Sequence, residues 1–240
     1  MAFDIVNITG RAHSDALKHV LGDSPLYAVG NVRLLGKKAM GVCGSRDASA
    51  SALKWAYDFG REAAKHDVVV VSGYARGVDR EAHRGALEAG GQTIAVLPEG
   101  IRHFRLVRGL RPVVDMNRNL LAVSTFDPDA PWEIWRAMER NKLIVGLSAA
   151  LFVIEARERG GTINAAYEAV RQGKPLYAIS YTEELPGQEG NRKLLATSAI
   201  PVRHMGDLKS ALEEAMSQPP PEVKQLVMGL VGPGDHQEES

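Results

Sequence analysis

The first half of the chain carries the stretch Val68-Val-Val-Val-Ser-Gly-Tyr-Ala-Arg-Gly-Val-Asp-Arg-Glu-Ala-His83. Its run of four valines predicts a strand that is buried on both faces. The run breaks at Ser72-Gly73 into a turn that carries Arg76 and Asp79, and a helical pattern follows. A strand end, a glycine turn and a helix start together place backbone N–H groups at one point, and this geometry suits an anion.

Apolar runs and helical spacings alternate along the rest of the chain. Further strands are predicted at Ala39–Cys43, Thr93–Leu97, Leu120–Ser124, Ala150–Glu155 and Leu176–Ile179. Helices are predicted over 53–64, 79–89, Trp132–Val145, 162–172 and Asp207–Met216. Strands that alternate with amphipathic helices form βαβ units. The predicted fold class is therefore α/β and Rossmann-like, with a mostly parallel sheet and helices on both faces.

The chain divides into three parts by pattern. Residues 1–36 are mixed, with a short helix expected around Asp15–Leu21, and we interpret them as an N-terminal extension. Residues 37–217 hold the regular alternation and form the predicted Rossmann-like domain. Residues 218–240 are Pro-rich and then Gly- and acid-rich, so we expect a disordered tail there.

The composition is that of a globular protein, with 45% hydrophobic and 24% charged residues. Lys plus Arg and Asp plus Glu number 29 each, so a nucleic-acid signal has to be local. The single cysteine, Cys43, excludes an intramolecular disulfide and suits a reducing cytoplasm. No apolar run approaches the roughly 18 residues of a membrane span, and no secretory leader is evident, so we expect a cytoplasmic protein without membrane contact.

Glycines follow four of the predicted strands and point to a phosphate site. Three of these strand ends hold Gly44, Gly73 with Gly77, and Gly160 with Gly161, and the fourth is followed by Pro98-Glu-Gly100. Glycine is common in every βα turn, but four such turns on one sheet edge predict a crevice where a bare backbone lets an anion approach. Arg46 and Arg76 project from these turns; inside a crevice each offers a bidentate fork to phosphate, although on a surface neither needs an explanation.

Local charge adds a second signal for nucleic acid. Five arginines follow the third of these strands, interleaved with His103 and Phe104: Arg102, Arg105, Arg108, Arg111 and Arg118. Arg136, Arg140 and Lys142 recur on the following helix. Basic side chains beside rings are typical of a sequence-blind single-strand site, whereas the alternative is a solvated helix face.

Other polar residues favour structural roles. Asp79 and Thr162 are predicted as helix N-caps, although the Thr162 hydroxyl could also meet a phosphate. His83 is expected to pack or to hold a hydrogen bond. Zinc-ligand spacing, a Walker-type loop and Gly-x-Gly-x-x-Gly are all absent from the sequence, so we expect no metal and no cofactor.

The motifs resemble those of a known family. Ser72-Gly-x-Ala-Arg-Gly-x-Asp79, Ala82-His83-Arg84-x-Ala86-Leu87 and Gly90-Gly-x-Thr-Ile-Ala-Val-Leu97 closely resemble the DNA-processing protein A family, DprA or Smf. Gly44-Ser-Arg46, Arg140-Asn-Lys-Leu-Ile-Val-Gly-Leu-Ser148 and Gly190-Asn-Arg-Lys-Leu-Leu-Ala196 are similar to further motifs of that family. The resemblance runs over about residues 39–215, with the motifs in the family's order. It places the chain in the wider Smf/DprA–LOG (SLOG) superfamily of Rossmann-like domains.

The resemblance implies a binding protein for single-stranded DNA. Members of the family act in DNA processing as recombination mediators, dimerise, and help to load a RecA-type recombinase during uptake of transforming DNA. The implied contacts are Gly44, Ser45, Arg46, Ser72, Gly73, Arg76, Gly77, Arg140, Asn141, Lys142, Gly160, Gly161 and Thr162. Leu143, Ile144 and Leu147 offer an apolar surface for a homodimer, and they suit a protein core equally well.

The sequence also departs from the family and leaves alternatives open. The family's Tyr-Pro-x-x-Asn motif is replaced by Ile101-Arg-His-Phe-Arg-Leu-Val-Arg-Gly-Leu-Arg111. Gly160-Gly-Thr-x-x-Ala-x-x-Glu168 leans toward the LOG-type nucleotide phosphoribohydrolases but lacks the middle glycine of their motif. Glu155 and Glu168 would be the catalytic carboxylates of such an enzyme, and a sensor domain for a nucleotide-derived ligand is a further alternative. The sequence favours a binder over an enzyme without deciding between DNA and a free nucleotide.

Overall fold

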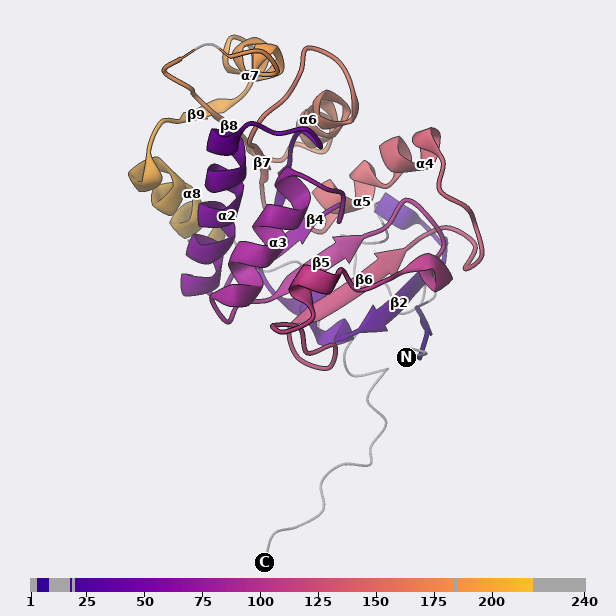
Figure 1. The fold of residues 1–240 in the computed structure, drawn as a ribbon. Helices are drawn as coiled ribbons and strands as arrows, with labels where there is room; N and C mark the ends of the chain where they lie inside the picture. The colour runs from indigo at the N-terminus through magenta and orange to yellow at the C-terminus, as the bar shows by residue number, and fades with distance from the viewer. Residues whose placement is uncertain (1–3, 9–17, 19, 184, 218–240) are drawn as a thin grey trace, which may run out of the picture.

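The computed structural model describes residues 4–8, 18, 20–183 and 185–217. Within these ranges the chain forms one nine-stranded sheet in the order β1-β2-β6-β5-β4-β3-β7-β8-β9 (Figure 1). The strands are β1 (Val6–Ile8), β2 (Leu26–Gly30), β3 (Ala39–Cys43), β4 (Val69–Ser72), β5 (Thr93–Val96), β6 (Leu120–Ser124), β7 (Leu151–Val153), β8 (Leu176–Ile179) and β9 (Ile200–Val202). Strands β3 to β9 pair in parallel, whereas β2 pairs antiparallel with both β1 and β6.

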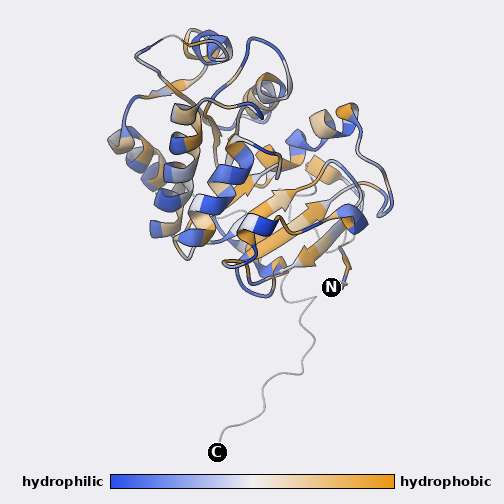
Figure 2. Cartoon of the chain, viewed as in Figure 1, coloured by the Kyte–Doolittle hydropathy of each residue, from blue (hydrophilic) through white to orange (hydrophobic). Residues whose placement is uncertain are grey.

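Helices cover both faces of this sheet because its strands are apolar on both faces. In β4, Val69 and Val71 pack into one core, and Val70 packs with Val68 into the other. The first core lies under α5 (Asn141–Gly146), α6 (Gly161–Arg171) and α7 (Glu189–Leu195). The second lies under α2 (Ala50–Lys65), α3 (Val78–Glu88) and α8 (Met205–Ser217). Figure 2 shows the apolar strands between helices with polar outer faces. The predicted Rossmann-like α/β class is confirmed.

The predicted helix Trp132–Val145 is wrong in one respect, because it is two helices. Helix α4 (Ile134–Glu139) ends and α5 begins at Arg140. Helix α4 buries none of its residues, whereas α5 buries Leu143 and its neighbours in the core. The two helices therefore differ in burial, since α4 stays at the surface while α5 packs in the core.

The expected N-terminal extension contributes to the sheet where it is described. Strands β1 and β2 and the 3-10 helix η2 (Val32–Gly36) all come from the first 36 residues. The helix expected around Asp15–Leu21 falls mostly on residues 9–17 and 19, which lie outside the described residues, as does the tail 218–240.

Helices α2 and α3 cross at two glycines. A Cβ added to Gly85 would lie 2.0 Å from the Tyr57 carbonyl oxygen, and one added to Gly60 would lie 2.2 Å from that of Ala82. The two backbones therefore touch at a distance that only glycine allows.

Replacing Gly85 with alanine should lower the free energy of unfolding by about 2 kcal/mol, because the added methyl group overlaps backbone that cannot move aside. Urea denaturation measures this change. Gly109→Ala is the matched control, since no atom lies within 4 Å of its added Cβ. Equal stability of the two variants would contradict the tight crossing.

Candidate phosphate and nucleic-acid site

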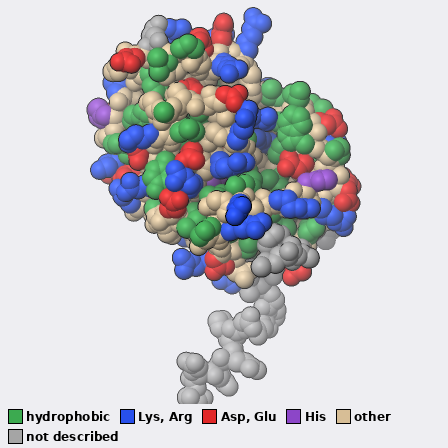
Figure 3. All heavy atoms as spheres, viewed as in Figure 1, with side chains coloured by type: hydrophobic (Ala, Val, Ile, Leu, Met, Phe, Trp, Pro, Cys, Tyr) green, Lys and Arg blue, Asp and Glu red, His purple; other side chains and the backbone are tan. Residues whose placement is uncertain are grey.

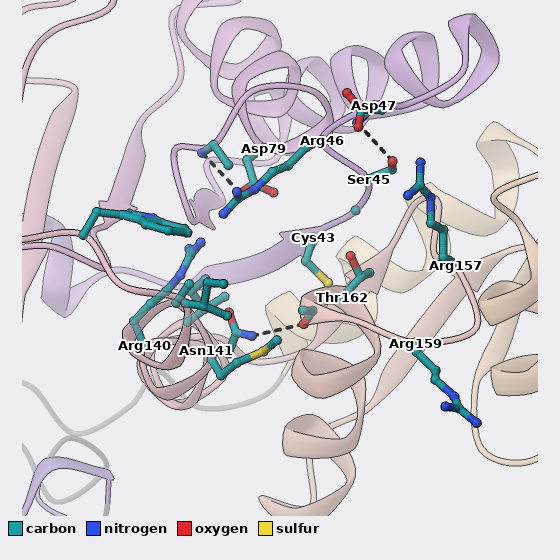
Figure 4. Close-up of a pocket in the computed structure, with 18 residues that line it drawn as sticks. Cys43, Ser45, Arg46, Asp47, Asp79, Arg140, Asn141, Arg157, Arg159 and Thr162 are labelled. Carbon is teal, nitrogen blue, oxygen red and sulfur yellow. Dashed lines mark hydrogen bonds between the residues drawn. The ribbon is translucent and has the colours of Figure 1, made fainter.

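A pocket of about 420 Å³ opens at the carboxyl ends of β3 and β7 (Figure 4). Three segments line it: Cys43–Asp47 after β3, the stretch from Trp132 to Ile144 on α4 and α5, and residues 157–162 before and in α6. Ala75 from the turn after β4 and Asp79 from the first turn of α3 complete the wall. The predicted convergence of strand ends on one crevice is therefore present in the structure.

The first turn of α6 faces this crevice without a side-chain cap. Gly160, with φ of 124°, is the N-cap residue and makes no capping bond. The first N–H groups of a helix lack partners within the helix and attract anions. Thr162 lies inside the first turn and lines the pocket, so its predicted role as N-cap is wrong. Gly160 takes the cap position because it alone there adopts a positive φ.

Gly44 and Gly77 serve the packing of two turns. A Cβ on Gly44 would lie 2.5 Å from Val78 Cγ2, and one on Gly77 would lie 2.3 Å from the Ser45 carbonyl oxygen. The amide of Val78 also donates to that oxygen at 3.2 Å. The glycines bring the turns after β3 and β4 into contact, which holds Ser45 and Arg46 at the edge of the crevice.

Arg140 forms the floor between these turns. Its side chain is buried, and Nη1 donates to the Val96 carbonyl oxygen at 3.2 Å. A Cβ on Gly73 would lie 1.6 Å from the same Nη1, so the guanidinium occupies the space that Gly73 leaves open. Both residues were predicted as DNA or phosphate contacts, and the structure shows in addition that they touch each other.

Asp79 balances the buried charge of Arg140. Burial raises the pKa of the Asp79 carboxyl, and the positive charge of Arg140 opposes that rise. Asp79 also accepts from the Ala75 amide at 3.4 Å. The prediction that Asp79 is the N-cap of α3 is wrong, because Gly77 holds that position and Asp79 lies in the first turn of the helix.

Three exposed arginines stand on the rim of the crevice. Arg46 extends across it, with its guanidinium carbon 5.5 Å from the centroid of the Trp132 ring. Arg157 and Arg159 leave the loop before α6 on the opposite side (Figure 4). Among the described residues, none of the three has a carboxylate within 4 Å, whereas Asp47 is paired with Arg76 at 2.7 Å. The rim therefore keeps a positive charge.

The structure brings together most of the predicted contacts but not all. Gly44, Ser45, Arg46, Arg140, Asn141, Gly161 and Thr162 line the crevice, and Gly73 and Arg76 line a cavity beside it. Ser72 is buried, and its hydroxyl donates to the Val42 carbonyl oxygen at 2.6 Å. Lys142 points to Glu139, with Nζ 2.7 Å from Oε1, and lies outside the crevice. Arg157, Arg159 and Trp132 were missed, although two arginines directly before a glycine helix start are a usable signal.

Both carboxylates of the hydrolase alternative are engaged elsewhere. Glu155 accepts from Ser49, at 3.1 Å from the amide and 2.6 Å from the hydroxyl, and thereby anchors the start of α2. Glu168 accepts from Gln172 at 2.8 Å and from Arg171. Neither side chain lines the crevice, so the geometry does not support that alternative.

The arginine-rich segment does not form one surface. It starts at the carboxyl end of β5, packs Ile101 and Phe104 on the sheet, and returns to the start of β6. Arg118 accordingly lies at the opposite edge, where its carbonyl oxygen accepts from Asn31 and Gln92. Arg102 pairs with Asp129, and Arg105 Nη1 donates to the carbonyl oxygens of Arg102 and Phe104. On the face of the molecule that Figure 3 shows, Lys and Arg side chains gather near the middle.

The described ranges hold no group of three or more His, Cys, Asp and Glu side chains that could bind a metal ion. Every helix in the same ranges is too short or too polar to cross a bilayer.

The fold and the crevice together define a Rossmann-like domain with a cationic crevice at one edge of its sheet. The family model described as DNA recombination-mediator protein A matches residues 5–213, and the chain belongs to this family. The protein Smf of Escherichia coli (strain K12) is 32% identical over 194 residues, which cover 78% of this chain and 50% of the relative. The chain spans 44% to 64% of the length of the curated relatives it matches.

Solved structures agree with this assignment. A structure of DNA processing protein A from Helicobacter pylori, whose subject is its single-stranded DNA binding mode, is 25% identical with a TM-score of 0.75. The match covers 88% of this chain and 97% of that one. A molybdenum cofactor binding protein from Rippkaea orientalis is 22% identical with a TM-score of 0.55, over 75% and 98% of the two chains, and shares the fold alone.

Proposed function

We propose that this chain binds single-stranded DNA as a DNA-processing and recombination-mediator protein. The observation that carries this proposal is the crevice itself, where Arg46, Arg157 and Arg159 surround the uncapped start of α6. The family membership and the single-stranded DNA bound by the Helicobacter pylori relative support the same ligand. The proposed unit is the Rossmann-like domain of residues 37–217, extended by β1 and β2.

The crevice suits a flexible strand better than a duplex. Phosphates along a single strand can enter a pocket while their bases turn onto an aromatic ring. Trp132 supplies such a ring, with 47% of its surface exposed beside Arg46. Contacts of this kind are largely indifferent to sequence.

Affinity for an oligonucleotide should fall as salt rises, because each phosphate that an arginine neutralises releases counterions. Three rim contacts correspond to a slope of about −2 in log K against log salt for a single strand. Fluorescence anisotropy with single-stranded DNA, double-stranded DNA and adenosine monophosphate at several salt concentrations measures this slope and the ligand class. Salt-independent binding would contradict the proposal, and tighter binding of the mononucleotide than of the strand would instead favour a nucleotide sensor.

We further propose that the chain acts without catalysis in the cytoplasm, as a homodimer that serves a RecA-type recombinase and DNA uptake. The buried free thiol of Cys43 suits a reducing compartment. The apolar residues expected at a dimer surface, Leu143, Ile144 and Leu147, are buried in the core and cannot form one. Tyr167 and Val170 on the outer face of α6 are exposed by 45% and 48% and are better candidates.

Light scattering at tens of micromolar should therefore report a mass near twice the 26.0 kDa of one chain. The paired substitutions Tyr167→Ser and Val170→Ser should return it to a monomer, because burial of these side chains drives the association. A wild-type mass of one chain would reject the dimer, and an unchanged dimer in the variant would reject this surface.

A further inference from the structure

The segment that follows β5 carries basic side chains that lie outside the crevice. Two turns of 3-10 helix, η3 (Ile101–His103) and η4 (Arg108–Leu110), lie within it. Ile101, Phe104 and Leu110 are buried, with 2%, 4% and 1% of their surface exposed. A spacing of three returns a side chain to the same side of a 3-10 helix. The apolar residues therefore face the sheet, and the residues that follow each of them or recur at the same spacing face solvent: Arg102, Arg105, Arg108 and Arg111.

Most of this positive charge is not balanced by a carboxylate. Arg102 pairs with Asp129, but the other three arginines do not have such a partner. Arg105 donates to two backbone carbonyl oxygens, which leaves its charge in place. Among the described residues, no carboxylate lies within 4 Å of Arg105, Arg108 or Arg111. These three side chains form the arginine ridge.

The arginine ridge begins beside the crevice. Tyr74 lines a neighbouring cavity that shares Arg46 and Arg140 with the crevice. The Val107 amide donates to the Tyr74 hydroxyl at 3.0 Å, and the rings of Tyr74 and Phe104 lie 5.6 Å apart. These contacts fix the segment against the wall of the site. From there it runs to the start of β6, at the opposite edge of the sheet.

We infer that the arginine ridge binds the phosphates of the same single strand beyond the crevice, and so lengthens the stretch of DNA that one chain holds. The inference rests on the proposed binding of single-stranded DNA. A strand that leaves the crevice past Tyr74 meets the ridge directly, and arginine is suited to phosphate. The ridge stands where the motif Tyr-Pro-x-x-Asn of the family is replaced, so it is a property of this chain's own sequence.

The ligand of the ridge is the backbone of the strand and not its bases. Stacking of a base needs an exposed ring. Phe104 is buried, and Nε2 of His103 lies 3.1 Å from the carbonyl oxygen of Asp129. Contacts to phosphate alone hold a strand in position without reading its sequence. The ridge therefore adds affinity for long strands of any sequence.

The test compares strands of six and twenty thymine nucleotides, because the shorter strand can occupy the crevice but not both surfaces. Replacing Arg105, Arg108 and Arg111 with alanine should weaken binding of the long strand roughly tenfold, the effect of three exposed charge contacts. Binding of the short strand should change by less than about twofold. In the wild-type protein the slope of log K against log salt should be steeper by about 2 for the long strand, and the variant should lose this difference. Fluorescence anisotropy measures both quantities.

A second variant keeps the bonds that hold the segment together. Arg108→Ala with Arg111→Ala retains Arg105, which donates to the carbonyl oxygens of Arg102 and Phe104. It should weaken binding of the long strand about fivefold, because two of the three contacts are lost.

The matched control removes three exposed positive charges from other elements. Arg61 lies on α2, Arg203 follows β9, and Lys209 lies on α8. Their replacement with alanine should change binding of the long strand by less than about twofold. A loss in this control equal to that of the ridge variant would overturn the ridge, and so would a ridge variant that weakens both strand lengths equally or neither.

A further strand separates single-stranded from double-stranded DNA on the ridge. It has six open thymine nucleotides with a hairpin at either end. The wild-type protein should bind it no more tightly than the six-nucleotide strand, and affinity equal to that for the open long strand would overturn a single strand as the occupant. Failure of the folded wild-type protein to bind the short strand at all would overturn the proposed function instead.

Discussion

Replacement of Arg46, Arg157 and Arg159 together with alanine should weaken binding of single-stranded DNA roughly a hundredfold. Each side chain is exposed on the rim of the crevice, and loss of a charged contact to phosphate costs about 1 kcal/mol at such a site. Three losses amount to about 3 kcal/mol, which corresponds to a roughly hundredfold loss of affinity. The salt dependence should fall with it, because fewer counterions are released. Anisotropy titrations at two salt concentrations measure both quantities.

A charge-matched control separates site-specific contacts from overall charge. Arg33, Lys37 and Arg118 precede strands β3 and β6 and therefore lie at the opposite edge of the sheet. Their replacement with alanine removes the same three charges and should change affinity by less than about threefold, the effect of distant screened charges. Equal losses in both triple variants would mean that net charge governs binding, and the crevice would lose its assigned role.

The central strands could be predicted because burial on both faces leaves a continuous apolar run. Ala39–Cys43, Leu120–Ser124 and Leu176–Ile179 have the bounds that the sequence predicted. The edge strands β1 and β9 could not, since each is three residues long and neither lies in a longer apolar run like the one that marks β7. Strand β9 also contains Pro201, which lacks an N–H and is tolerated only where pairing is incomplete, as at an edge.

The site was predictable where it depends on local turns and unpredictable where it depends on tertiary packing. The glycine turns located the crevice, because strand ends of a parallel sheet share one edge. The arginines after β5 do not reveal the path of that segment. Arg118 was therefore grouped with Arg102 and its neighbours, although it lies at the other end of the strands. Lys142 was predicted on one continuous helix with Arg136 and Arg140. The helix breaks at Arg140, and the chain changes direction there, so Lys142 lies outside the crevice.

Arg140 links the family motifs into one structural unit. Its guanidinium fills the space above Gly73 and receives the electrostatic support of Asp79. Two motifs that are separate in sequence therefore meet at one buried charge. Such a charge is costly to leave unpaired, so the two motifs stabilise each other in the fold.

His83 lies in the same buried region and should make stability depend on pH. Nδ1 of His83 contacts Thr93 Oγ1, whose hydroxyl donates to the Val70 carbonyl oxygen, so Nδ1 carries the proton. Nε2 is left bare and buried without a partner among the described residues. Burial, with Arg140 and Arg80 nearby, lowers the pKa of His83 from 6.5 to about 3. A proton added to Nε2 would place a second charge beside the guanidinium of Arg140.

The free energy of unfolding should therefore fall as the pH drops from 6.5 toward 3. In this window the unfolded chain binds a proton at residue 83 that the folded chain does not, at about 1.4 kcal/mol per pH unit. The raised pKa of Asp79 acts in the opposite sense, so the comparison must be made against His83→Gln, which retains Asp79. Urea denaturation between pH 7 and 4.5 should show the wild-type protein losing stability more steeply than the variant. A protonated Nε2 needs a hydrogen-bond acceptor, and this buried nitrogen has none among the described residues. Parallel profiles would therefore contradict a neutral imidazole, and so would a His83 ring that titrates near pH 6.5 by NMR in the folded wild-type protein.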